Sequence, residues 1–492
     1  MAGWENQKFA MPMFRPWVPE RVRPWIYLVF AFLFQLSGGV YFGNLQQMVG
    51  ATSLMREDLQ LVAMCGVVGV NMPFPFLVRF KLRFTNHHLL INAALVIAAC
   101  NVLSLYVRWL PALCAISYIA GFFKLCGTFE CFSNIRLWIS PKEDFGVFLP
   151  TMYILILAAM PASGWMAQHL TATLGSWQAV HWLMAAAMLA IALLVHALTR
   201  PWRFARLPLV SLDWLGCCLW SAVMMEAIWL FTYGEYYNWS ASSTWNVVLA
   251  CLPVTVAVAI ARMRRIRHPY IEPSVWEHTR LIPILAMFLV AEMMNATPHV
   301  LQGTLTDGIL HWGHATTQRF YLFELAGYAL GAAFTIFWHR ALRWRYAPLL
   351  VLGFCCMLAY QALLYAYVSP SLNVERLCLS TFLRTFGYAI IFSGLTICMK
   401  RIYEFPIFFM ALTVSGFIRN GVAESMCAGW YGYRLRRQVA DTLARGLHPD
   451  FQGVLQVAVK EVWGTVCILG IAILLLVLAG LAWRRGRLVG QG

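Results

Sequence analysis

The sequence predicts an all-α integral membrane protein with about fourteen transmembrane helices. Three observations predict it: the 492-residue chain is 61% hydrophobic and 12% charged, its mean hydropathy is +0.66, and apolar segments recur from near residue 25 to residue 483. Soluble domains carry about 25% charged residues. A soluble chain of this length would also divide into domains joined by polar linkers, and no such change in composition is present. The lipid bilayer is therefore its expected surroundings.

The apolar segments set the number of crossings. A helix needs about 20 apolar residues to span a bilayer. Segments of that kind begin near residues 25, 59, 88, 110, 146, 177, 212, 243, 281, 319, 346, 376, 405 and 463. An even number of crossings places both termini on one side.

The distribution of basic residues supports this count, because cytoplasmic loops of membrane proteins collect Lys and Arg. If both termini are cytoplasmic, that side carries 25 of the 37 basic residues, the opposite side nine and the spans three. Five of the nine lie in one long connection, residues 430–462. The net charge of +16 is thus explained by topology, and we expect no nucleic-acid partner.

The connection 430–462 has a helical pattern interrupted by "GLHP" (446–449). We expect two amphipathic pieces that lie as a cap on the outer face. A docking site for an external partner is the alternative.

Eight formal charges fall inside the expected spans. They are Lys124, Glu130, Glu226, Glu292, Glu324, Arg384, Arg419 and Glu424. Exposing all of them to lipid would cost about 20–28 kcal/mol, at about 2.5–3.5 kcal/mol each. Since a typical domain is stable by about 5–15 kcal/mol, these side chains are expected to face the protein interior or a water-filled cavity.

Lys124 and Glu130 lie in one span, within "FFKLCGTFECF" (122–132). Six residues rotate a helix by about 600°, so the two groups point about 120° apart, and each needs a partner on another helix. Among the eight charges five acids face three bases, which leaves two acids without a cation. A carboxylate shielded from water and lacking a cation binds a proton more readily, as proton coupling requires. A purely structural role in fixing helix register is the alternative.

The acids are not equal candidates for proton coupling. Glu130 ranks first because it is deep in its span, and Glu292 and Glu324 follow. Glu226 is near the end of its span, where water is close. Arg419 and Glu424 form a second cluster among small residues, for which close helix packing is the alternative explanation.

Four motifs recur in a familiar order. These are "MPASGWMAQHLTATLGSWQAVHW" (160–182), "SLDWLG" (211–216), "YGEYYNW" (233–239) and "RHPYIEPSVW" (267–276). Together they resemble the fourteen-span drug:proton antiporter branch of the major facilitator superfamily, the EmrB/QacA type. The residues that carry the resemblance are Pro161, Gly164, Trp177, Asp213, Trp214 and Gly216.

The resemblance implies a major facilitator fold of two six-helix bundles with two additional helices between them. The implied divisions are a basic cytoplasmic tail (1–24), an N-terminal bundle (25–200), two added helices with linkers (201–278), a C-terminal bundle (279–483) and a basic tail (484–492). In such proteins the bundles rock about a site at the membrane midplane to give alternating access.

The sequence also departs from that family. The loop "VRFKLRFTNHH" (78–88) keeps Arg79, Lys81 and Arg83 but lacks the family's acid. Ser37 or Gly38 stands about where an acid is often found in the first span, and Lys124 lies near the family's arginine. Proton coupling would therefore use another carboxylate.

The predicted function is secondary transport: efflux of amphipathic or lipophilic small molecules in exchange for protons, across a bacterial inner membrane. The expected partners are the substrate, protons and lipid, with a periplasmic adaptor and an outer-membrane duct as a hypothesis. No cofactor and no enzymatic activity are expected. An importer or symporter on the same fold is the first alternative.

A membrane-embedded metal enzyme is the second alternative to transport. "HWGH" (311–314), with Asp307 upstream, is the sequence's one arrangement with ligand-like spacing. The fourteen cysteines include no CxxC pair and are expected to be small buried apolar residues.

Overall fold

The computed structural model describes residues 11–202, 212–342, 346–446 and 450–489. Within these ranges the chain is helical and carries no strand beyond a single bridge between Phe14 and Thr199. The first ten residues of the basic tail, most of the linker before the added helices, the "LHP" of the expected break and the last three residues lie outside the described part.

The first half of the chain forms one helical bundle. Its helices are α1 (Arg23–Leu36), α2 (Leu45–Thr52), α3 (Arg56–Asn71), α4 (Leu77–Arg83), α5 (Asn86–Tyr106), α6 (Leu110–Ile139), α7 (Phe145–Leu174) and α8 (Gln178–Leu198). Helix α6 is central, because α1, α3 and α5 all pack against it.

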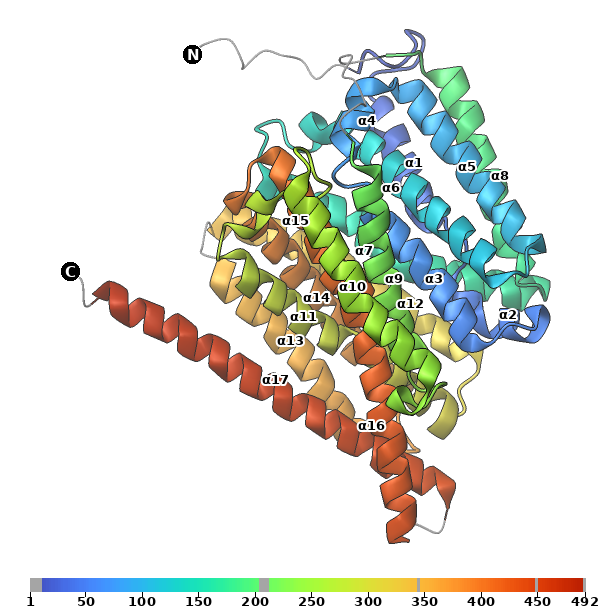
Figure 1. Cartoon of the computed structure of the whole chain (residues 1–492), viewed down its shortest axis with the longest axis vertical. Helices are drawn as coiled ribbons and strands as arrows, with labels where there is room; N and C mark the ends of the chain where they lie inside the picture. The colour runs from blue at the N-terminus through green and yellow to red at the C-terminus, as the bar shows by residue number, and fades with distance from the viewer. Residues whose placement is uncertain (1–10, 203–211, 343–345, 447–449, 490–492) are drawn as a thin grey trace.

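The second half forms the other bundle. Its helices are α11 (Leu281–Asn295), α12 (His314–Phe337), α13 (Tyr346–Tyr367), α14 (Val374–Ile402), α15 (Phe405–Gly416), α16 (Glu424–Arg445) and α17 (Phe451–Val489). Helix α14 is central here and packs against α11, α12 and α13. Between the halves run α9 (Trp214–Thr232) and α10 (Ser243–Arg265), with α10 crossing the front of the molecule in Figure 1.

Twelve helices among the described residues are long and apolar enough to cross a membrane. Of the fourteen expected spans, the first two fall short of that length: α1 has 14 residues and α3 has 16. Each is followed by a break and a short helix, α2 or α4. A helix begins within five residues of every other expected start except the last, where α17 begins at Phe451 rather than near residue 463.

Four π-helical segments interrupt the second bundle. They are Pro298–Gln302, Thr304–Ile309, Trp338–Leu342 and Phe417–Ala423. Such segments widen the helical turn and are frequent at functional sites. The first two follow α11, just as a break at Ser37–Tyr41 follows α1, so the first span of each bundle is discontinuous.

The connection 430–462 forms two helical pieces, as predicted, but they do not lie where they were expected. It does not lie as a cap on the outer face: α16 runs without a break to Arg445, and α17 starts at Phe451 and continues into its membrane-crossing part. Figure 1 shows the end of α16 and the start of α17 projecting beyond the other helices as a hairpin. No proline interrupts residues 424–445, so extending the helix retains its hydrogen bonds, and α16 and α17 pack together.

The two bundles meet along α7 and α12, with further contact between α7 and α14. We call the end where α1, α5 and α7 begin the N-terminal face, and the other end the opposite face. The bundles enclose a cavity between them, and this cavity positions the candidate site.

Candidate functional site

A cavity of about 2990 Å³ lies between the bundles and is lined by both. Its walls carry charged side chains on the same few helices as large aromatic rings. The charged and aromatic lining residues that concern the site are Lys81, Lys124, Phe129, Tyr153, Glu292, His299, Tyr321, Glu324, Tyr328, Arg384, Tyr388, Phe392, Arg419 and Glu424. Six of the eight charges singled out in the sequence therefore line one cavity, and Glu130 and Glu226 do not.

Glu292 is the centre of the first charged group. It is 5% exposed on α11, accepts a hydrogen bond from the Tyr388 hydroxyl and lies 3.9 Å from Arg419 Nε. Arg419 belongs to the π-helical segment Phe417–Ala423, and its guanidinium lies 4.1 Å from the centre of the Phe392 ring. The negative charge of this buried acid is therefore stabilised by one cation and by one hydroxyl donor.

Arg384 is the centre of the second group. It is 4% exposed on α14, and its guanidinium donates to Glu324 Oε1 at 2.6 Å and to Asn295 Oδ1 at 2.6 Å. Its Cζ also lies 5.6 Å from the centre of the Tyr360 ring. The pair joins α12 to α14 and Asn295 adds α11, so one cation connects three helices of the second bundle.

Glu424 completes the acidic side of the cavity. It begins α16 and lies 3.6 Å from His299 Nε2, which the first π-helical segment after α11 provides. An imidazole neutralises a carboxylate when it is protonated, so this acid has a conditional partner where Glu292 and Glu324 have arginines.

Glu130 and Lys124 do find separate surroundings, as their spacing requires. Glu130 is 2% exposed and lies 3.6 Å from Lys81 Nζ, while Asn134 Nδ2 donates to its Oε1 at 2.8 Å. Lys124 lines the cavity, and within the described part of the chain it forms no ion pair. Glu130 therefore pairs with Lys81, which is not one of the eight charged residues predicted inside the spans. As a result Lys124, a base, lacks an ion-pair partner, whereas the sequence had predicted that only acids would lack one.

Glu226 lies away from the cavity. It is on α9 and accepts a hydrogen bond from Thr255 Oγ1 of α10 at 3.0 Å. This contact holds the two added helices together, so Glu226 has a structural partner without any cation.

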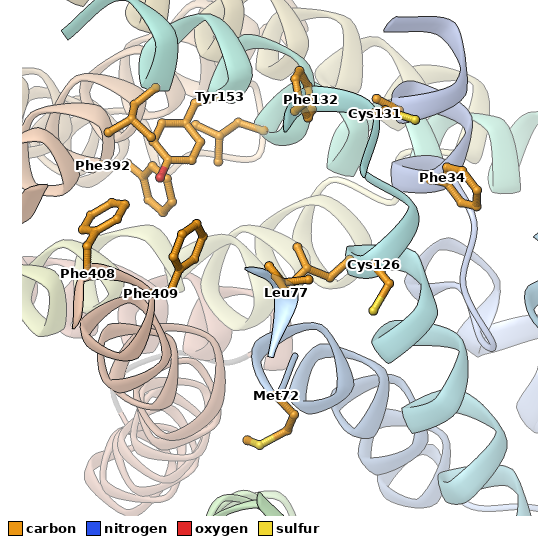
Figure 2. Close-up of a cluster of buried hydrophobic side chains, with 14 of the residues drawn as sticks. Phe34, Met72, Leu77, Cys126, Cys131, Phe132, Tyr153, Phe392, Phe408 and Phe409 are labelled. Carbon is orange, nitrogen blue, oxygen red and sulfur yellow. The ribbon is translucent and has the colours of Figure 1, made fainter. Parts of the chain in front are cut away.

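Aromatic rings from both bundles meet on the N-terminal side of the cavity. The ring centroids of Tyr153 and Phe392 are 4.5 Å apart, and those of Phe129 and Phe409 are 5.6 Å apart. Figure 2 shows Tyr153 beside Phe392, with Phe408 and Phe409 across from them. These rings place apolar surface along the contact between the bundles on this side of the cavity.

A polar contact lies at the N-terminal face itself. Asp144 caps α7 by accepting from Gly146 N at 2.8 Å, and its second oxygen lies 2.8 Å from His339 Nε2 of the other bundle. Partial burial acts to raise the pKa of Asp144, but the hydrogen bonds with His339 and Gly146 outweigh it and hold the pKa below its usual value. The charged form of Asp144 therefore favours contact between the bundles at this face.

The motif in α7 and α8 places small residues where helices approach. At Gly164 a Cβ atom would lie 2.7 Å from the Tyr321 ring of the opposite bundle, so a larger residue would push the bundles apart. Helix α7 continues through Pro161, and Trp177 comes directly before α8, where its carbonyl accepts from Asn44 Nδ2 at 3.1 Å.

The "SLDWLG" motif anchors the added helices. Asp213 caps α9 by accepting from Gly216 N at 2.8 Å, and the same oxygen accepts from Arg262 of α10 at 2.7 Å. Its other oxygen accepts from Tyr270 N at 3.2 Å. Trp214 packs on Phe76 with ring centroids 4.9 Å apart. One aspartate thus joins two of the sequence motifs to each other and to α10.

Comparison with solved structures identifies the arrangement. The crystal structure of the nucleoside transporter NupG matches with a TM-score of 0.56 and 12% identity, covering 93% of this chain and 99% of that one. The crystal structure of the human organic anion transporter MFSD10 (TETRAN) matches with a TM-score of 0.55 and 13% identity, over 93% and 100% of the two chains. The chain has the fold of major facilitator transporters.

The likeness to major facilitator transporters is one of fold. No protein-family model matches the sequence, and no curated protein is similar to it. The all-α membrane architecture expected from the sequence is confirmed, and its fold is the one seen in those two transporters.

The metal alternative depends on the "HWGH" motif, of which the side chain of His314 lies outside the described part of the structure. Among the side chains that the structure describes, no group of three or more His, Cys, Asp or Glu is close enough to hold a metal ion. His311 instead pairs through Nδ1 with the backbone oxygen of Asp307, at 3.0 Å.

Several residues of the site escaped the sequence-based reasoning. Lys81 looked like one of three basic residues in a cytoplasmic loop, yet it reaches Glu130. Tyr388 follows Arg384 by four residues, a spacing that places both on one helix face and could have indicated it. Asn295 follows Glu292 by three residues on α11, a spacing that could have indicated it too. His299 carries no such signal, because the π-helical segment after α11 alters the periodicity.

Proposed function

We propose that the protein is a proton-coupled secondary transporter that exports amphipathic small molecules by alternating access. The observation that carries this proposal is the cavity between the bundles, whose second-bundle wall holds Glu292, Glu324 and Glu424 among large aromatic rings. Aromatic rings can hold the apolar part of a substrate. Carboxylates that are shielded from bulk water can bind and release protons during transport.

The contacts of Glu292 supply a coupling device for this proposal. Its carboxylate faces Arg419, and the Tyr388 hydroxyl donates to the same oxygen. Proton binding at Glu292 removes the charge that attracts Arg419, which frees the guanidinium to turn toward Glu424, five residues further along the chain. Proton binding thereby changes the electrostatic interactions of Arg419 in the segment Phe417–Ala423, which contacts the first bundle.

Substrate flux against imposed pH gradients tests the proposal. Purified protein in liposomes is given radiolabelled amphipathic probes, one anionic, one cationic and one neutral, with protein-free liposomes as control. Exchange predicts accumulation of at least one probe in an acidic lumen, since protons leave as substrate enters. Accumulation driven by acid outside would instead indicate the importer or symporter, and no protein-dependent flux would contradict transport.

The distribution of basic residues supports an orientation for the chain in its membrane. We propose a bacterial inner membrane with both termini cytoplasmic, which makes the N-terminal face the cytoplasmic one. The cytoplasmic end of the substrate path is then the aromatic closure around Tyr153 and Phe392.

The projecting hairpin of α16 and α17 supports the hypothesis of a periplasmic adaptor. It extends beyond the other helices on the opposite face and carries exposed basic residues, Arg436 and Arg445 among them. Co-purification of an adaptor with the intact chain, and its loss when 436–457 is replaced by a short linker, would support this partner. Transport to completion without any adaptor would count against it.

A further inference from the structure

Lys124 presents an ammonium group to the cavity from the first bundle. It lines the cavity together with Gly121 and Thr128, which lie three residues before it and four after it on α6. That spacing places all three on one helix face. Lys124 therefore faces the same space as the acids of the second bundle, from the opposing wall.

Three other cations of the cavity wall are matched with acids. Arg384 pairs with Glu324, and Lys81 with Glu130. Arg419 pairs with Glu292, while Glu424 has His299. Within the described residues Lys124 forms no ion pair, and its spacing along α6 from Glu130 keeps those two side chains apart.

The position of Lys124 is fixed by close packing of α6 on α3. A Cβ atom at Gly121 would lie 2.0 Å from the Gly66 carbonyl oxygen, and one at Gly69 would lie 2.1 Å from the Tyr118 carbonyl oxygen. The two backbones are therefore in direct contact, and α6 cannot rotate to bury the ammonium elsewhere. Phe129, five residues further along, adds an apolar surface that reaches Phe409 of the other bundle.

We propose that Lys124 binds the anionic group of the transported molecule, so that the substrates are amphipathic acids with an aromatic or aliphatic body. The inference rests on the proposed transport function and names its substrate class. The ammonium pairs with a carboxylate or sulfonate, while the rings around Phe129 and Phe409 hold the apolar part. A neutral analogue of the same shape retains the apolar contacts and loses the ion pair.

Binding in an uncharged detergent tests this class separately from transport. Pyrenebutyrate is compared with the neutral pyrenebutanol by equilibrium dialysis on wild type, Lys124→Gln, Lys124→Arg and Lys460→Gln. Lys460 lies on α17 outside the cavity and is the matched control. We expect Lys124→Gln to weaken pyrenebutyrate binding about tenfold or more and to leave pyrenebutanol unchanged. Lys124→Arg and Lys460→Gln should stay near wild type.

Other outcomes are decisive as well. Equal binding of the acid by wild type and Lys124→Gln, equal loss of acid and alcohol, or no binding of pyrenebutyrate to wild type would overturn the subsite. Loss of acid binding in Lys124→Gln, together with absence of pH-driven flux in wild type, would support the subsite and contradict the proposed transport.

Discussion

The charged residues of the cavity differ in whether their partner is fixed. Arg384 holds Glu324 and Asn295 with two hydrogen bonds of 2.6 Å, an arrangement that stabilises the contact of α11, α12 and α14. Glu292 and Arg419 are further apart, at 3.9 Å. Since a loose pair is easier to separate, Glu292 is the better candidate for a group that gains and loses a proton during transport.

Glu292→Gln is expected to reduce proton-driven accumulation of substrate to the level seen in protein-free liposomes. The amide keeps the shape of the side chain but cannot take up a proton, so the exchange loses its driving force. Glu226→Gln is the matched control, because Glu226 is also a span acid but contacts Thr255 rather than the cavity. Both variants are measured by radiolabelled flux under an acid-inside gradient.

Undiminished accumulation in Glu292→Gln would remove Glu292 from the coupling mechanism. Glu424 and Glu324 would then be the next candidates on the cavity wall. Glu130, ranked first from the sequence, lies against Lys81 and away from the cavity lining, which fits a role in fixing α6 against α4.

At the scale of elements, Asp213 makes three interactions that position the added helices α9 and α10. Asp213 caps α9, pairs with Arg262 of α10 and accepts from the backbone of Tyr270. Loss of these interactions leaves a helix start without its cap and a partly buried guanidinium without its acid.

Asp213→Ala is expected to lower the free energy of unfolding by about 1–3 kcal/mol, the combined range for a lost cap and a lost charged hydrogen bond. The midpoint of thermal unfolding in detergent, followed by size-exclusion fluorescence, should fall accordingly. Asp441→Ala is the control, since Asp441 is exposed on α16. Equal midpoints for wild type and Asp213→Ala would show that the motif does not anchor α9.

The contact of α7 with the end of α12 makes a prediction about pH. The folded-state pKa of Asp144 is lowered, so its ionisation stabilises the folded protein above the unfolded-state pKa, near 3.9, and this contribution disappears as pH falls through the folded-state value. Asp144 is partly exposed, so the effect is expected to be below about 1 kcal/mol.

The measurement for Asp144 compares thermal unfolding of wild type and Asp144→Asn at several pH values. Wild type should be the more stable of the two at pH 6–7, and the difference should shrink as pH falls below the unfolded-state pKa of Asp144, near 3.9. A difference that persists unchanged at low pH would mean that the carboxylate charge is not what holds this contact.

For the whole molecule, composition determined much of the fold. Apolar segments of about 20 residues predicted nearly every helix start, because the bilayer requires that length. The same rule could not predict that the first span breaks at Ser37–Tyr41, or that π-helical segments follow α11, since these features depend on the cavity that surrounds them. The outer connection was predicted correctly as two helical pieces but wrongly as a surface cap, because amphipathicity does not distinguish a surface helix from a helical hairpin.

The candidate site was predicted in part. The cost of burying charge in lipid correctly indicated an interior location for the charged residues, and six of the eight line one cavity. Their pairing was not predictable, because it depends on which helices meet in the fold. Lys81 belongs to a basic loop sequence yet pairs with Glu130, and His299 pairs with Glu424 from a different helical segment.

The central claim is that substrate crosses the membrane through the cavity as the two bundles separate alternately at each face. Phe145 of α7 and Phe405 of α15 face one another at the N-terminal face, with ring centroids 6.2 Å apart. Phe145→Cys and Phe405→Cys in a cysteine-depleted chain can be joined by a short reducible bis-methanethiosulfonate, with each single variant as control.

Flux through that doubly substituted protein in liposomes tests the claim most directly. Complete cross-linking is expected to stop pH-driven transport, and reduction of the link is expected to restore it, while treated single variants remain active. Unchanged transport by the fully cross-linked protein would contradict alternating access through this cavity.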